Sequence, residues 1–239
     1  EEFKLQTPTW LSWYTKNDQY SREKFSGDLE ALRSFYLNRG YLEFSVDSAQ
    51  VSITPDKEDV HLTVAVTEGG IYRVNEIRFS GQLLGRADEF RSLMKLQPGE
   101  TFSGQRLSES QKAIVERLGS LGYAFANVNP VPDIDRTKKE VSFDVLVDPG
   151  RRVYVRRINV SGNARTRDEI IRRELRQFED AWYDSEKIRL SRERIGRLGY
   201  FTDVRIDTVP VPDANDQVDL AVSVKEEATG AISMGIGLS

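Results

Sequence analysis

The sequence predicts an α+β fold of tandem βααββ domains, each a three-stranded mixed sheet packed against two helices. The main observation is a Gly-Tyr pair that recurs about 80 residues apart, at Gly40-Tyr41, Gly122-Tyr123 and Gly199-Tyr200. Apolar residues at helical spacing precede each pair, and apolar residues at alternating positions follow it. A pattern of this length that occurs three times indicates one structural unit copied in tandem.

The opening strand of a unit is marked by alternating apolar residues. In the second and third units these are Tyr72, Val74, Ile77 and Phe79, and Val153, Val155, Ile158 and Val160. The first unit has no such run. Its residues 4–8 resemble residues 95–98, where the first helix of the second unit is expected to end. We therefore expect the first unit to lack its first strand and most of its first helix.

Two helices are expected after the opening strand. In the third unit Thr166 and Glu169 have the spacing of a capping box, which places the start of the first helix at Thr166. This helix is expected to carry Ile170, Ile171, Leu175 and Phe178. The second helix has one apolar stripe, which in the first unit is Phe25, Leu29, Leu32 and Tyr36. It should end at the glycine of the Gly-Tyr pair, a residue that adopts the left-handed conformation of many helix ends.

Two further strands complete each unit. The last one alternates Val60, Leu62, Val64 and Val66 with polar or small residues, and residues 141–147 and 218–224 repeat the pattern of a half-buried strand. The strand just after each Gly-Tyr pair, residues 44–54 in the first unit, is expected at an exposed edge of its sheet. An extended client can pair with such an edge as an added strand.

These elements predict four parts of the chain. Residues 1–70 form a truncated first domain, residues 71–151 a second domain and residues 152–227 a third. Residues 228–239 contain alternating apolar residues and form either the start of a strand or a disordered tail.

Composition disfavours several classes of function. The 239 residues carry a formal net charge of −4, whereas nucleic-acid binding needs a basic face. There is no cysteine, and the one histidine, His61, falls at a polar position of a predicted strand. We therefore expect no catalytic, metal or cofactor-binding residues and no enzyme activity. A soluble hydrolase is the alternative from a different class.

Three sequence runs resemble POTRA domains, the polypeptide-transport-associated modules of the Omp85 family. They are residues 27–41, 172–179 and 216–219. The resemblance covers essentially the whole chain and implies the third, fourth and fifth of five such domains, in the periplasm of a Gram-negative bacterium. Residues 229–237 resemble the first strand of the family's membrane barrel. The implied function is to assist outer-membrane protein assembly. A TamA-like or two-partner-secretion transporter, or a divisome-type single POTRA module, are the alternatives.

The resemblance also implies partner sites. A BamB-like lipoprotein would bind the edge strand of the first unit at Asp47, Gln50, Val51 and Ile53. A BamD-like lipoprotein would bind Arg172 and Glu179, which are seven residues apart and are therefore expected on one face of the capped helix. Unfolded outer-membrane proteins would be the clients, and no cofactor is implied.

Overall fold

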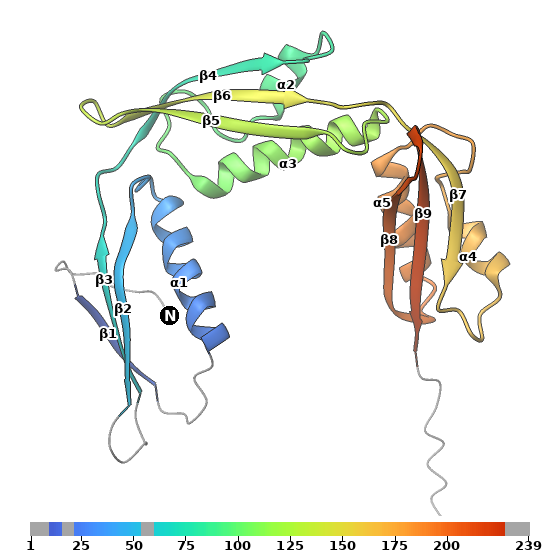
Figure 1. Cartoon of the computed structure of the whole chain (residues 1–239), viewed down its shortest axis with the longest axis horizontal. Coiled ribbons are helices and arrows are strands. Elements are labelled where there is room, and N and C mark those ends of the chain that lie inside the picture. Colours follow the sequence, from blue (N-terminus) through green and yellow to red (C-terminus); the bar gives the residue numbers. More distant parts are fainter. Residues whose placement is uncertain (1–9, 16–21, 54–59, 228–239) are drawn as a thin grey trace, which may run out of the picture. The chain divides into compact units, whose positions relative to one another are not determined.

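A computed structural model of the chain describes residues 10–15, 22–53 and 60–227 (Figure 1). Packing divides the chain into two compact units, Glu1–Ala113 with Asn129–Leu146, and Ile114–Val128 with Val147–Ser239. The described residues form three separate sheets of three strands, in the orders β1-β3-β2, β4-β6-β5 and β7-β9-β8.

The helices and strands follow one another in a repeating order. The first sheet contains β1 (Trp10–Thr15), β2 (Ser45–Ile53) and β3 (Val60–Thr67), and helix α1 (Arg22–Leu37) precedes β2. The second contains β4 (Arg73–Gly81), β5 (Asn127–Asp135) and β6 (Glu140–Asp148), with α2 (Ala87–Leu93) and α3 (Gly104–Ser120) between β4 and β5. The third contains β7 (Tyr154–Ser161), β8 (Phe201–Val211) and β9 (Ala214–Glu226), with α4 (Asp168–Glu174) and α5 (Ser185–Gly196) between β7 and β8.

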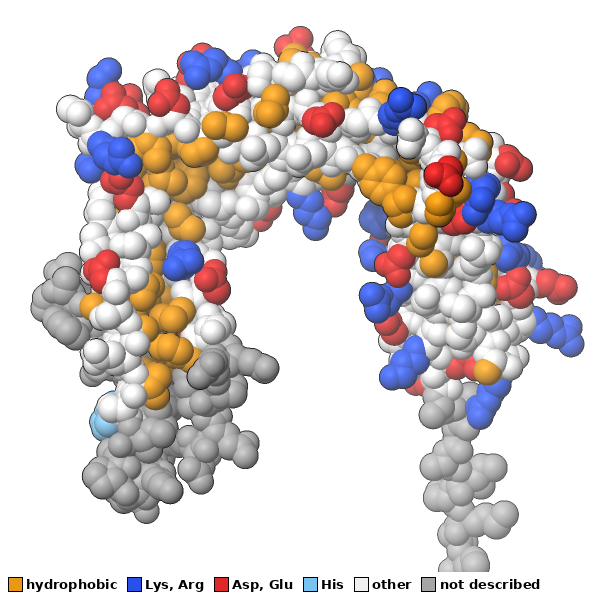
Figure 2. Space-filling view, in the orientation of Figure 1, with side chains coloured by type: hydrophobic (Ala, Val, Ile, Leu, Met, Phe, Trp, Pro, Cys, Tyr) orange, Lys and Arg blue, Asp and Glu red, His pale blue; other side chains and the backbone are white. Residues whose placement is uncertain are grey.

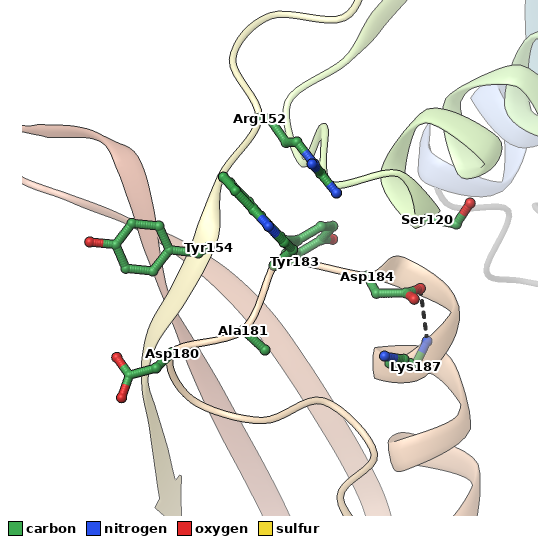
Figure 3. A pocket seen from close by; sticks show the side chains of 9 residues that line it. Ser120, Arg152, Tyr154, Asp180, Ala181, Tyr183, Asp184 and Lys187 are labelled. Carbon is green, nitrogen blue, oxygen red and sulfur yellow. Dashed lines mark hydrogen bonds between the residues drawn. The ribbon is translucent and has the colours of Figure 1, made fainter.

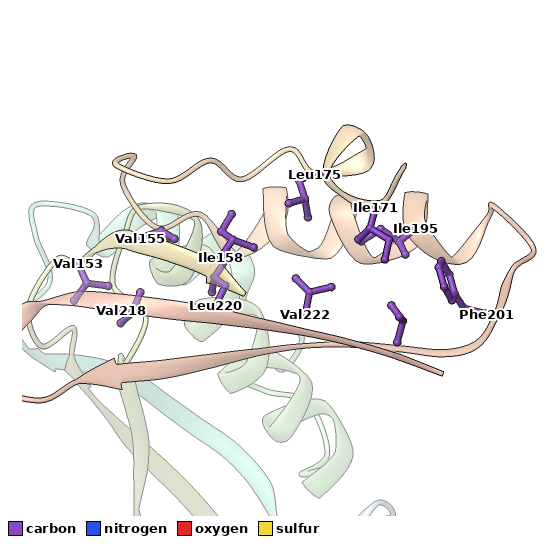
Figure 4. Close-up of a cluster of buried hydrophobic side chains, with 11 residues drawn as sticks. Val153, Val155, Ile158, Ile171, Leu175, Ile195, Phe201, Val218, Leu220 and Val222 are labelled. Carbon is purple, nitrogen blue, oxygen red and sulfur yellow. The ribbon is translucent and has the colours of Figure 1, made fainter. Parts of the chain in front are cut away.

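The third domain shows why this pattern folds. β9 is its central strand and runs parallel to β7 and antiparallel to β8, so the sheet is mixed as predicted. The alternating residues Val218, Leu220 and Val222 point to one face of β9 and are at most 2% exposed. They pack against Ile171 of α4 and Ile195 of α5, both fully buried (Figure 4). Burial of each such side chain contributes about 1.5–3 kcal/mol, which holds both helices on the sheet. The predicted fold class is confirmed.

The first sheet departs from this plan. The structure places at the edge of the sheet a strand, β1, that the sequence did not predict. β1 comes after residues 4–8, where the first helix is expected to end, so it is not the opening strand that this unit was expected to lack. β1 runs antiparallel to β3, whereas β7, at the same edge of the third sheet, runs parallel to β9. The sheet is therefore antiparallel rather than mixed, and α1 is its one helix among the described residues. The aromatic run at 10–15 has the composition of a strand and pairs with the free side of β3.

Helix α4 is shorter than predicted. It begins at Asp168, its N-cap residue is Arg167, and no side chain caps it, so the capping box at Thr166 is wrong. The Thr166 backbone N–H donates instead to the Glu226 carboxylate at the end of β9 (2.7 Å). The helix ends at Glu174, and Phe178, expected on its buried face, lies beyond it with 63% of its surface exposed.

Candidate functional site

The sheet orders place two kinds of strand at the edges. β2, β5 and β8 are edge strands, as predicted for the strand that follows each Gly-Tyr pair. The opposite edges belong to β1, β4 and β7. An edge strand turns one row of backbone N–H and C=O groups away from its sheet, so these rows are candidate sites for pairing with another polypeptide.

The edge strand β2 carries the residues predicted for a BamB-like partner. Asp47 lies at a β-bulge between Val46 and Ser48, and its carboxylate accepts a hydrogen bond from the Thr67 hydroxyl (2.7 Å). Gln50 and Val51 are exposed, Val51 by 48%. Ile53 is the last residue of β2, and its side chain lies outside the described part of the structure. The structure therefore places Asp47, Gln50 and Val51 along one accessible strand.

The β7 edge of the third sheet is already occupied by other parts of this chain. The Val155 N–H donates to the Ala181 carbonyl (2.8 Å), and the Val155 carbonyl accepts from the Asp180 N–H (2.7 Å). Just before the strand, the Val153 N–H donates to the Gly122 carbonyl (2.9 Å), and the Val153 carbonyl accepts from the Tyr183 N–H (3.0 Å). The segment between α4 and α5 thus pairs with the start of β7.

The side chains of Arg172 and Glu179 bond the backbone of Ile158, further along the same edge of β7. A Glu179 carboxylate oxygen accepts from the Ile158 N–H (2.7 Å), and the Arg172 guanidinium donates to the Ile158 carbonyl (2.9 Å). The two side chains approach each other to 3.9 Å and remain 42% and 45% exposed. The expectation that they share a helix face is wrong because α4 ends before Glu179. They meet because both reach the backbone of one residue of β7.

A buried glutamine shapes this segment. Gln177 is 1% exposed, and its side-chain amide donates to the Phe178 carbonyl (3.1 Å) and the Trp182 carbonyl (3.0 Å). Its side-chain oxygen accepts from the Asp184 N–H (2.9 Å). Gln177 therefore fixes the backbone path from α4 to α5. We missed this role because a single glutamine between two helices carries no sequence signal of it.

The same segment borders a hollow of about 620 Å³ (Figure 3). Trp182 is 51% exposed. The Arg152 guanidinium lies over the Trp182 ring, 4.3 Å from the ring centre, and the Tyr154 ring meets the Trp182 ring edge-on. The lining residues are Ser120, Arg152, Tyr154, Asp180, Ala181, Trp182, Tyr183, Asp184 and Lys187. The Asp184 carboxylate accepts from the Lys187 backbone N–H (3.3 Å) and so caps α5. Charges of both signs line the hollow, which gives it no strong preference for anions or cations.

Carboxylates with shifted pKa values serve the fold. A hydrogen bond from the Thr166 N–H, with a second from the Arg165 N–H, lowers the pKa of Glu226. A hydrogen bond from Arg156 lowers the pKa of Asp219, which joins β7 to β9.

On the face in Figure 2, acidic and basic side chains are interleaved. Within the described ranges, no three His, Cys, Asp or Glu side chains gather as a metal site. No helix there has the length and hydropathy of a membrane span.

Comparison with known proteins identifies the repeat. A family model described as POTRA, surface antigen variable number repeat, matches residues 3–69, 72–150 and 153–227. The chain therefore belongs to the POTRA family, as predicted from the sequence.

The chain is similar to the outer membrane protein assembly factor BamA of Neisseria meningitidis serogroup B, with 36% identity over 95% of this chain and 28% of the relative. It is 30% identical to BamA of Buchnera aphidicola, over 98% of this chain and 38% of the relative. The crystal structure of Haemophilus influenzae BamA POTRA3-5 superimposes with a TM-score of 0.82 and 34% identity, and the match covers 88% of this chain and 83% of that one. The predicted resemblance to POTRA domains 3–5 is confirmed, and the chain spans about a third of these curated relatives.

Proposed function

We propose that this chain forms the periplasmic arm of an outer-membrane protein assembly factor and holds unfolded client proteins at the open edges of its sheets. Assembly-factor relatives match 95–98% of the chain. The observation that carries the proposal is the contrast between edges. In the described part of the structure no backbone bond reaches the outer side of β2, the side away from β3, or the outer side of β8, the side away from β9, whereas the outer side of β7 is closed.

Energetics favour loose binding at these edges. Four added backbone hydrogen bonds contribute about 2–6 kcal/mol net, while ordering four client residues costs about 4–8 kcal/mol. Backbone pairing alone is therefore too weak for tight binding, and side chains beside the strand must supply the rest. Val51 is half exposed on β2 and offers apolar contact to many client sequences. Weak holding with little sequence preference suits a client that must be released for insertion.

Titration of the isotope-labelled chain with a peptide of alternating apolar and polar residues tests this function. We expect the amide signals of β2 and β8 to move and their hydrogen exchange to slow, because added pairing covers their outward N–H groups. The Val74 N–H of β4 donates to the Glu100 carbonyl (2.8 Å), and the Val74 carbonyl accepts from the Gly99 N–H (2.7 Å), so the start of this edge is also covered. The amides of β4 and β7 serve as the internal control and should change little. Shifts confined to helix surfaces, or equal on both edges, would reject pairing at the open edges.

The β2 edge is also our proposed site for a BamB-like lipoprotein, through Asp47, Gln50, Val51 and Ile53. Val51 is an exposed large apolar residue of this strand. Val51→Lys should weaken capture of that lipoprotein at least tenfold, because a lysine ammonium would lose hydration in an apolar contact. Ser48→Lys, at an exposed position of the same strand, is the matched control and should cost less than about threefold. Equal losses would point to general disturbance of β2.

Arg172 and Glu179 are our proposed site for a BamD-like lipoprotein. Each side chain bonds Ile158 and still exposes more than 40% of its surface, so a partner can reach the remaining polar atoms. Desolvated charges in such an interface change binding by several kcal/mol when reversed, whereas charges at its rim change it by less than about 1 kcal/mol.

Two variants separate partner binding from the fold. Glu179→Gln keeps an oxygen for the Ile158 N–H and removes the charge, so the third domain should keep its unfolding midpoint while lipoprotein capture weakens about tenfold or more. Glu179→Lys removes both and should lower both quantities. Capture of the BamD-like lipoprotein by Glu179→Lys at the wild-type level would remove this site from the proposal.

A further inference from the structure

The first Gly-Tyr corner joins two domains. Gly40 has φ +96° and is buried, and its carbonyl accepts a hydrogen bond from the Tyr72 N–H (2.9 Å) at the start of the second domain. A Cβ at Gly40 would lie 2.9 Å from the Ile71 side chain and 2.7 Å from that of Thr101. The glycine therefore stops helix α1 and also receives the chain that follows the first sheet.

The second corner repeats this arrangement. Gly122 has φ +103° and is buried, and its carbonyl accepts from the Val153 N–H (2.9 Å). A Cβ there would lie 2.7 Å from the Arg152 side chain. Different side chains cover the two glycines, but the bonded groups are the same. In both corners the incoming backbone donates one N–H to the glycine carbonyl.

The third corner has the same Gly-Tyr pair, but no described residue packs over its glycine. Gly199 has φ +73° and is exposed, and no described atom lies within 4 Å of a Cβ built on it. Tyr200 exposes 52% of its surface, whereas Tyr41 and Tyr123 are partly buried. The loop from the tyrosine to the next strand is shorter here, since β8 begins at Phe201.

The chain leaves the third sheet beside this corner. Phe201 pairs with Glu226, the last residue of β9, and the Glu227 N–H donates to the Tyr200 carbonyl (2.9 Å). In the first two units the N–H that reaches the glycine carbonyl comes six residues after the last buried valine of the central strand, at Tyr72 after Val66 and at Val153 after Val147. The equivalent valine of β9 is Val224, and the same count from it arrives at Gly230, which lies outside the described residues.

We propose that the Gly199-Tyr200 corner is the docking surface for the segment of this chain that follows β9, with the Gly230 N–H as donor to the Gly199 carbonyl. The first two corners show the same bond between a glycine carbonyl and the chain that follows. β9 ends beside Tyr200, so the segment after it begins next to the Gly199-Tyr200 corner. The third domain would then be fixed to whatever follows it by the same joint that links the domains to one another. This inference does not depend on which clients or lipoproteins the chain binds.

Hydrogen exchange and carbonyl shifts of the 239-residue chain test the proposal. The Gly230 amide should exchange at least tenfold more slowly than those of Thr229 and Ser233, because a bonded amide must open before it exchanges. Gly230→Pro removes the donor and should move the Gly199 carbonyl carbon signal upfield, with the bonded Gly122 carbonyl as reference.

Ser233→Pro is the matched control, because it places the same ring three residues beyond the predicted contact. It should leave the Gly199 carbonyl signal unchanged. A Gly230 amide that exchanges as fast as its neighbours, or a Gly199 signal that responds equally to both proline variants, would overturn the proposal.

Discussion

The two edges of the third sheet differ although they flank the same central strand. Val155 and Ile158 of β7, and Val153 just before the strand, have both backbone groups bonded within the chain. For Ile158 the partners are the side chains of Arg172 and Glu179. On β8, no such cover exists among the described residues. A small sheet has two edges that can attract other polypeptides, and this domain closes one of them with its own loop.

The comparison gives Arg172 and Glu179 a structural role beside any role in partner binding. A loss of binding on mutation at either residue therefore has two possible causes, a missing contact or an opened β7 edge. Variants that separate the two causes differ in the size of their expected effects.

The largest effect is expected from Gln177→Leu. The change leaves the Phe178 and Trp182 carbonyls and the Asp184 N–H without their side-chain partner, which should lower the free energy of unfolding by about 2–4 kcal/mol. Denaturant unfolding of the chain measures it. Gln105→Leu, at an exposed position of α3, is the control and should change stability by less than about 0.5 kcal/mol. Equal, small effects would show that the loop does not depend on Gln177.

A smaller effect is expected from Glu179→Ala. Loss of the acceptor for the Ile158 N–H should lower the free energy of unfolding by about 1–2 kcal/mol and speed exchange of that amide about tenfold. Glu186→Ala removes an exposed carboxylate of α5 that only approaches Arg189 at 3.9 Å, and should have almost no effect. An unchanged Ile158 exchange rate in Glu179→Ala would contradict the closed-edge description.

The smallest effect concerns pH. The pKa of Glu226 lies below its ordinary value of 4.5 because backbone N–H groups bond its carboxylate, and that of Asp219 lies below 3.8 because Arg156 does. A lowered folded-state pKa contributes stability above the unfolded-state value and loses it as pH falls through the folded-state value. Unfolding midpoints should therefore fall as pH drops below about 4.5.

The double variant Glu226→Gln, Asp219→Asn should flatten that decline, since it removes both titrating groups. Glu186→Gln, at an exposed site, is the control and should leave the slope as it is. A slope unchanged by the double variant would show that other carboxylates cause the acid sensitivity.

The sequence predicts the features that depend on neighbouring residues. The alternating valines of β9, the helix stop at Gly122 and the edge position of β8 all follow from local patterns and appear in the structure. The bonds from Glu179 and Arg172 to Ile158 could not be predicted in the same way. They depend on where α4 ends and how Gln177 directs the next residues, which tertiary packing decides.

One wrong prediction and one missed strand have the same origin. Thr166 has the spacing of a capping residue, but its N–H is bonded by Glu226, sixty residues away, so the helix starts later. Trp10–Thr15 has no counterpart at that place in the repeat, yet it pairs with β3 because an open strand side was available. In both cases a distant partner outweighed a local signal.

The contrast between edges is tested most directly by a matched pair of cysteines in this cysteine-free chain. Asp207 of β8 and Asn159 of β7 both pair with Ala221 of β9, so they occupy equivalent positions on opposite edges of one sheet. A client peptide with a central activated disulfide should trap Asp207→Cys at least tenfold faster than Asn159→Cys, after correction for each thiol's reaction with a small disulfide. Equal trapping rates, or faster trapping at Asn159→Cys, would contradict the account.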